Sequence, residues 1–120
     1  MVSKTWIAIA VAVAFLAGAP AKAYSQKSFS GFAAYYDKGY SGRTACGERY
    51  EPGKLTAAHR TLPFGTRLRV TDNKTHRSVL VTVNDRGPFT KGRVLDLSYA
   101  AATALQMQGR GLVRVTAAVE

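Results

Sequence analysis

The sequence predicts a mainly β protein, a small closed barrel with one or two short helices. Three observations favour this fold class. Short segments rich in β-branched and aromatic residues recur along the chain, and turn signals separate them at regular intervals. One segment has the composition of a helix. A closed barrel also removes the unpaired edge strands that so small a sheet protein would otherwise expose.

The expected strands follow one another along the chain. They span residues 32–36, 55–60, 66–71, 78–83, 94–97 and 112–119. Residues 66–71 and 78–83 alternate between apolar and polar side chains around a polar turn cluster, which predicts an antiparallel hairpin. Ser98 can cap a helix over residues 99–105 that ends near Gly109. Residues 24–30 are polar and expected to be flexible, so the folded domain should span residues 31–120. We expect this domain to be a monomer.

Residues 1–23 have the three parts of a secretory signal peptide. Lys4 precedes the uncharged apolar run 6–18, and Ala21-Lys22-Ala23 offers the small residues that a signal peptidase recognises. The run is too short to span a bilayer comfortably, and no cysteine follows it to carry a lipid. We therefore expect a soluble protein of the periplasm or the exterior that begins at Tyr24, without stable membrane insertion.

The expected mature chain is strongly basic. Without Lys4 and Lys22 it keeps 15 basic residues against 7 acidic ones, a net charge of +8. In a cytosolic protein this charge would suggest nucleic acid, but export excludes that partner and leaves acidic polymers or lipid headgroups of the envelope. Cys46 is the only cysteine, so no internal disulfide can form, and we expect its thiol to be buried.

The most informative motif is Asn84-Asp85-Arg86-Gly87-Pro88-Phe89, which follows the apolar segment 78–83. Gly87 permits backbone conformations that a side chain forbids, and Pro88 fixes its own φ and should keep Gly87 extended. The motif therefore presents Asp85 in a restricted orientation at the end of a strand, where functional sites are common. An ordinary polar turn is the alternative interpretation.

Few other residues offer chemistry. Glu48 lies in the loop 44–50 and His59 ends the segment 55–59, where a solvated carboxylate and a packed histidine are the structural alternatives. Cys46 with His59 could form a nucleophilic pair if the thiolate were exposed. Glu48, His59 and Asp85 could together bind a metal, but no closely spaced ligand pair accompanies them. We therefore expect no metal and no other cofactor.

Five motifs cover nearly all of residues 31–119 in a fixed order. They are GFAAYY (31–36), TACGERY (44–50), LTAAHRTLPFGT (55–66), VNDRGPF (83–89) and GRVLDLS (92–98). Together they resemble the rare lipoprotein A (RlpA) family. The resemblance implies a six-stranded double-psi β-barrel, as in barwin-like and expansin-like domains, and lytic transglycosylase activity on peptidoglycan glycan strands that lack stem peptides. It also implies functional roles for Glu48, His59 and Asp85, which match the family's Glu, His and Asp.

The implied reaction cleaves the β-1,4 bond between N-acetylmuramic acid and N-acetylglucosamine. It requires an acid that protonates the leaving oxygen and groups that stabilise an oxocarbenium-like centre. The muramyl 6-hydroxyl then attacks and leaves a 1,6-anhydro end, so one residue can act first as acid and then as base. We expect Asp85 in this role, with Glu48 supporting it, His59 orienting a carboxyl group or sugar hydroxyl, and Asp96 as the rival acid. The candidates for sugar contacts are Tyr35, Tyr36, Arg86 and Phe89.

A non-enzymatic expansin-like module that binds wall polysaccharide is the competing interpretation. It would use the same groove, but only catalysis needs a carboxyl group in a partly buried setting. Two features differ from other members of the family. Cys46 stands where many relatives have Asn or another small polar residue. The sequence also shows neither the lipid-bearing cysteine nor the C-terminal SPOR domain that is common in septal members, so septal recruitment is not expected.

Overall fold

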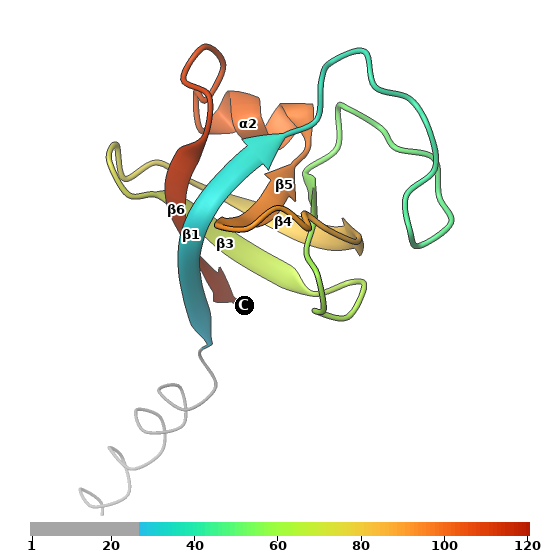
Figure 1. The fold of residues 1–120 in the computed structure, drawn as a ribbon, viewed down its shortest axis with the longest axis horizontal. Coiled ribbons are helices and arrows are strands. Elements are labelled where there is room, and N and C mark those ends of the chain that lie inside the picture. Colours follow the sequence, from blue (N-terminus) through green and yellow to red (C-terminus); the bar gives the residue numbers. More distant parts are fainter. Residues whose placement is uncertain (1–26) are drawn as a thin grey trace, which may run out of the picture.

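The computed structural model describes residues 27–120, in which six strands close into a barrel. The strands are β1 (Ser28–Tyr35), β2 (Thr56–Ala58), β3 (Arg67–Asp72), β4 (Ser78–Asp85), β5 (Arg93–Leu97) and β6 (Val113–Val119). One helix, α2 (Tyr99–Ala104), lies between β5 and β6 in this part of the chain. Figure 1 shows α2 across one end of the barrel. The predicted double-psi β-barrel is thus confirmed, while the predicted signal peptide lies outside the described residues.

The strands are paired in the order β1-β5-β2-β4-β3-β6, with β6 returning to β1. β1 pairs with β5 and β2 with β4 in parallel, and the remaining pairs are antiparallel. The predicted hairpin of β3 and β4 is present, with Leu68 opposite Val81 and Val70 opposite Val79. These four side chains are buried, because alternate residues of each strand face the same side.

Aliphatic side chains from β3, β4, β5 and β6 fill the barrel, whereas the buried apolar side chains of β1 and β2 are alanines. The largest fully buried apolar ones are Leu68, Val70, Val81, Val83, Leu95, Leu97, Leu105, Met107 and Val115. Ser98 begins α2 as predicted: its hydroxyl accepts a hydrogen bond from the Ala101 N–H at 3.1 Å. Ala101 and Ala102 are buried and pack the helix against this core.

Several boundaries differ from the expected ones. Ser28–Ser30, which we expected in a flexible segment, pair with residues 116–118 of β6 and so begin β1. β2 is limited to Thr56–Ala58, since Leu55 is exposed and the chain leaves the sheet after Ala58. β4 continues to Asp85, so this residue ends a strand and does not lie in the following turn.

The turn after β4 also differs in detail. Gly87 has φ +117°, a conformation open to glycine rather than the extended one that we expected before proline. The Arg60 guanidinium holds this turn from the side, because its Nε donates to the Pro88 carbonyl oxygen at 2.7 Å and one Nη donates to the Arg93 carbonyl oxygen at 2.9 Å. The motif is therefore restricted by contacts as well as by its own sequence.

Candidate active site

Three donors hold the carboxylate of Asp85 at the end of β4. Oδ1 accepts hydrogen bonds from the backbone N–H groups of Ala45 at 2.7 Å and Arg86 at 2.9 Å. Oδ2 accepts a short hydrogen bond from the Tyr36 hydroxyl. Because two N–H groups already occupy Oδ1, Oδ2 is the oxygen that can carry a proton, and a hydroxyl can then either donate to it or accept from it. The site therefore fixes both the position of this carboxyl group and the oxygen that would exchange protons.

Tyr36 itself is held by a cluster of tyrosines. Its ring stacks on Tyr50 at 4.6 Å between centroids, with 15° between the planes, and meets the edge of Tyr40 at 5.2 Å. Burial, together with the adjacent Asp85, raises the pKa of the Tyr36 hydroxyl far above its ordinary value, so this group keeps its proton. We expected Tyr36 to contact a sugar; the structure instead turns its hydroxyl to the carboxylate and its ring to other tyrosines.

The loop 43–50 brings Glu48 to the side of β4. The Cys46 N–H donates to the Asn84 carbonyl oxygen at 3.3 Å, and Thr44 closes the loop on the Glu48 carbonyl oxygen through its N–H at 2.7 Å and its hydroxyl at 2.9 Å. Glu48 is exposed and lines a cavity of about 410 Å³ that also reaches Asn84. Its carboxylate therefore borders a cavity on the side of Thr82 and Asn84, and it forms no ion pair within residues 27–120.

Cys46 is half-buried, not buried as expected. Its sulfur lies 3.2 Å from Thr44 Oγ1 and 3.7 Å from Glu48 Oε1, on a loop that is open to solvent on both sides.

His59 follows β2 and holds the loop that comes after it. Its Nδ1 accepts hydrogen bonds from the N–H groups of Thr61 and Leu62, both at 3.1 Å, so the neutral ring carries its proton on Nε2. Burial and the nearby Arg86 and Arg60 lower the pKa of His59, which favours this neutral form. The His59 backbone N–H donates to the Asp85 carbonyl oxygen at 3.2 Å, so the two candidates lie next to each other, with His59 just beyond the end of β2.

The Arg86 guanidinium also binds other groups of the protein. Its Nη1 donates to the carbonyl oxygens of Leu62 at 2.8 Å and His59 at 3.3 Å, and its guanidinium lies 4.1 Å from the centroid of the Phe64 ring. This arrangement fastens the loop after β2 to the end of β4. The predicted sugar contact by Arg86 would have to coexist with these bonds.

Asp96 lies close to Asp85 through the sheet. Both residues pair with Ala58 of β2, Asp85 from β4 and Asp96 from β5. Two strand spacings separate their Cα atoms, about 10 Å. Asp96 forms an ion pair with Arg93 at 2.8 Å, and the helix cap is Ser98, so Asp96 does not cap the helix. The spacing of Asp85 and Asp96 along the sequence does not reveal that both residues pair with Ala58.

The other aromatic candidates separate into two kinds. Tyr35 packs against the core and meets Tyr99 edge-on at 6.3 Å, whereas Phe89 is 78% exposed just beyond the Gly87-Pro88 turn. Phe89 is thus the most exposed of the three aromatic residues that we expected to contact a sugar. Sequence reasoning missed Tyr40, Tyr50 and the Ala45 N–H; nothing in local composition marks a backbone donor 40 residues from its acceptor.

Within residues 27–120, no three side chains of His, Cys, Asp or Glu gather closely enough to hold a metal ion. Among the helices of that same region, none is long and apolar enough to cross a membrane.

Comparison with known proteins identifies relatives of this chain. The family described as lytic transglycolase matches residues 28–117. A probable endolytic peptidoglycan transglycosylase RlpA of Nostoc sp. is 57% identical over 91 residues, which cover 73% of this chain and 24% of that protein. The endolytic peptidoglycan transglycosylase RlpA of Pasteurella multocida is 46% identical over 71% of this chain and 29% of its own length. The chain thus spans between about a quarter and a third of these relatives.

Solved structures share the barrel. An expansin from Clavibacter michiganensis superposes with a TM-score of 0.61 at 25% identity, over 78% of this chain and 50% of that one. A Streptomyces papain inhibitor superposes with a TM-score of 0.63 at 24% identity, over 78% of this chain and 96% of the inhibitor. The inhibitor supports the fold alone.

Proposed function

We propose that this chain, which belongs to the lytic transglycolase family, cleaves the β-1,4 bond between N-acetylmuramic acid and N-acetylglucosamine in peptidoglycan and leaves 1,6-anhydro ends. One observation carries the proposal: a single carboxyl group, Asp85, is fixed by three donors so that only Oδ2 is open to a proton. RlpA relatives of 41–57% identity support the same reaction class.

In this reaction Asp85 first donates a proton and then accepts one. Protonated Asp85 gives its Oδ2 proton to the glycosidic oxygen as the bond to the muramyl C1 breaks, which leaves an oxocarbenium-like centre and a carboxylate. The carboxylate then takes the proton of the muramyl 6-hydroxyl while that oxygen bonds to C1. The acid is regenerated and no water is consumed. Tyr36 accepts from the protonated acid and donates to the carboxylate, so it stabilises both states.

The remaining candidates assist this residue. Glu48, exposed beside the cavity at Asn84, stabilises the positive charge that develops on the sugar. His59 keeps the loop after β2 in place and offers Nε2–H to a sugar hydroxyl. Asp96 is already paired with Arg93 through Oδ1, whereas Asp85 forms no ion pair in the described part of the chain, which favours Asp85 as the acid. Phe89 offers an exposed face for a sugar ring.

The decisive experiment incubates residues 24–120 with glycan strands freed of stem peptides and searches for anhydromuramyl products by mass spectrometry. Their appearance, and its dependence on Asp85, would support cleavage. Co-sedimentation with the strands under conditions that release no anhydro ends would support a binding module instead. That alternative is favoured by the structural likeness to an expansin.

Removing the Tyr36 hydroxyl should slow the reaction and leave the fold intact. In Tyr36→Phe the ring still stacks on Tyr50, while Asp85 loses one of its three donors and its Oδ2 is free to rotate toward water. Loss of a hydrogen bond to a charged group corresponds to a kcat about 10- to 100-fold lower. Initial rates on glycan strands measure this, and Tyr40→Phe, which keeps the aromatic cluster, is the matched control. Equal rates for wild type and Tyr36→Phe would contradict the role of the hydroxyl.

We also propose that the chain is exported and acts in the periplasm or outside the cell as a monomer. Export should remove residues 1–23, because Ala21-Lys22-Ala23 places small residues at both recognition positions. N-terminal sequencing of the envelope fraction should therefore begin at Tyr24. An intact Met1, or recovery only from the cytosol, would refute this localisation.

A further inference from the structure

A second cavity, of about 570 Å³, lies far from Asp85. It borders the turn that joins β3 to β4 and the segment that leads into β6, with Asp72, Lys74 and Arg114 in its wall. This turn precedes the first residue of β4, whereas Asp85 is the last. The eight residues of the strand separate the two sites by about 20 Å or more. The cavity therefore belongs to a different surface of the barrel.

The wall of this cavity carries excess positive charge. Its cations are Lys74, Arg110 and Arg114, and its only acid is Asp72. Asp72 is fully buried, and its Oδ2 binds Arg110 Nη1 at 2.7 Å, so this pair is internally neutral. Neither Lys74 nor Arg114 forms an ion pair with a carboxylate in the described part of the chain. Two cationic side chains thus lack a counter-charge, and an anion is the ligand they would favour.

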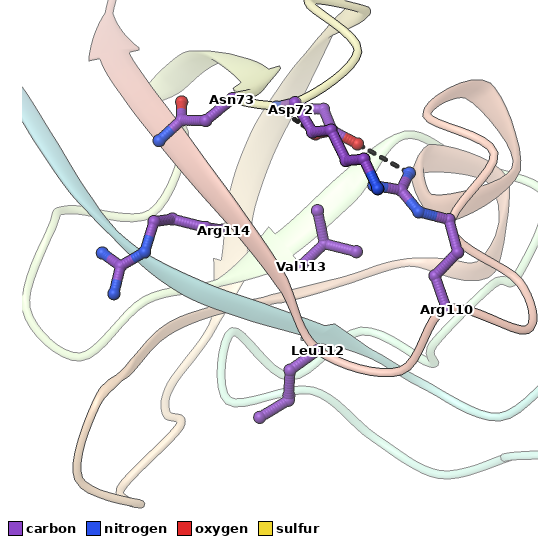
Figure 2. Close-up of a pocket in the computed structure, with 7 residues that line it drawn as sticks. Asp72, Asn73, Arg110, Leu112, Val113 and Arg114 are labelled. Atoms are coloured by element: carbon purple, nitrogen blue, oxygen red, sulfur yellow. Dashed lines mark hydrogen bonds and ion pairs between the residues drawn. The ribbon is translucent and has the colours of Figure 1, made fainter.

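Two of the donors in the wall are oriented in advance. Thr116 Oγ1 donates to Asn73 Oδ1 at 2.8 Å, which fixes the amide and leaves its nitrogen as a donor. The Arg114 guanidinium lies 4.5 Å from the centroid of the Phe32 ring, a contact that holds its plane while its N–H edge stays exposed. Figure 2 shows the Asn73 amide and the Arg114 guanidinium on one side of the cavity and the Asp72–Arg110 pair on the other.

The floor between these groups is apolar. Figure 2 shows Leu112 and Val113 between the two polar sides. Leu112 is 49% exposed, and Val113 belongs to the barrel core. A ligand that suits this lining has an anionic group that accepts hydrogen bonds from the donors and an apolar part that contacts the floor. An organic phosphate meets both needs, because its several oxygens accept from an Arg fork, an amide and an ammonium group at once.

We propose that this cavity binds the phosphodiester group of an anionic envelope component, through Lys74, Arg114 and the Asn73 amide. The charge of the chain, +8 once Lys4 and Lys22 are removed, supports attraction to such a component. Binding here would hold the barrel against an anionic surface while the surface that carries Asp85 stays free. The site does not depend on the proposed cleavage reaction, and its test needs no glycan strands.

The test uses a soluble diester, glycerophosphoglycerol, as the probe in an NMR titration of residues 24–120. Amide shifts should move in residues 73–75 and 110–114 and remain unchanged at Ala45 and Arg86. The double variant Lys74→Gln, Arg114→Gln should bind about tenfold more weakly or worse, since it removes both uncompensated charges. Both side chains lie in exposed residues, so the variant should fold. Arg67→Gln, Lys91→Gln removes the same charge elsewhere and should bind like wild type.

Three outcomes would overturn the site: no saturable shifts, shifts confined to the Asp85 surface, or equal weakening in the control variant. A second arm distinguishes the source of the phosphate. Vesicles that contain phosphatidylglycerol should bind wild type and not the Lys74, Arg114 variant if the group is a lipid headgroup. If the soluble diester binds and the vesicles do not, the phosphate of a soluble or polymeric ester is the ligand class.

Discussion

Replacing Asp85 with Asn is expected to lower the rate of glycan cleavage by about 10²- to 10⁴-fold, the usual contribution of a general acid. Asn keeps the shape of the side chain and can keep its bonds: its carbonyl oxygen accepts from the Ala45 and Arg86 N–H groups, and its amide nitrogen donates to the Tyr36 oxygen. The variant loses only the ability to exchange a proton. Rates of anhydromuramyl release and thermal unfolding curves, measured side by side, should show a large loss of activity with little loss of stability.

The controls separate Asp85 from the other acids. Asp37→Asn changes an exposed acid just after β1 and should leave the rate unchanged. Glu48→Gln should also impair cleavage severely, and His59→Ala should do so with some loss of stability, because His59 holds the loop after β2. An active Asp85→Asn combined with a folded but inactive Asp96→Asn would transfer the role of acid to Asp96.

Much of the fold follows from local patterns. The β3–β4 hairpin could be predicted because alternation in both strands and the polar turn between them are local properties. The Ser98 cap is equally local, since the hydroxyl and the N–H that it binds are three residues apart. The start of β1 could not be found this way. Ser28 and Ser30 are polar, and the segment becomes a strand through its pairing with residues 116–118 of β6 and the packing of Phe29 against the core.

The candidate site shows the same division. The motif around residue 85 could be recognised in the sequence, but the partners that orient the carboxylate could not, and Gly87 is not extended as we expected. Tyr36 is 49 residues away in the chain and the Ala45 N–H is 40. An aromatic residue in a sequence suggests sugar contacts, whereas the direction of its hydroxyl depends on the barrel. Arg86 illustrates this too, since carbonyl oxygens of the neighbouring loop occupy a guanidinium that we expected to contact substrate.

Stability should depend most strongly on a charge outside the candidate active site. Asp72 is fully buried at the end of β3, where its Oδ1 accepts from the Lys74 N–H at 2.8 Å and its Oδ2 binds Arg110. In Asp72→Asn the amide nitrogen would face the Arg110 guanidinium, donor against donor, and the ion pair would be lost. Because the Arg110 side chain is 30% exposed, the cost should be that of a lost hydrogen bond between charged groups, about 1.5–3 kcal/mol, and not the full cost of breaking a buried ion pair. The variant should therefore unfold at a clearly lower urea concentration at neutral pH.

The pH dependence of this loss identifies its cause. Burial alone would raise the pKa of Asp72, but the hydrogen bond from Arg110, those from the Lys74 and Thr75 N–H groups and the charge of Arg110 outweigh it, so the pKa lies below its usual value. A lowered pKa stabilises the fold at every pH above the unfolded value of about 3.9, and this stabilisation disappears as the pH falls through the folded value.

The difference in unfolding free energy between wild type and Asp72→Asn should accordingly shrink from neutral pH to about pH 2, as wild-type Asp72 becomes protonated. Urea titrations across this range measure it, with Asp37→Asn as the exposed control that should follow wild type. A difference that stays constant down to the lowest pH would mean that packing, and not the ionised carboxylate, accounts for the stability that Asp72 provides.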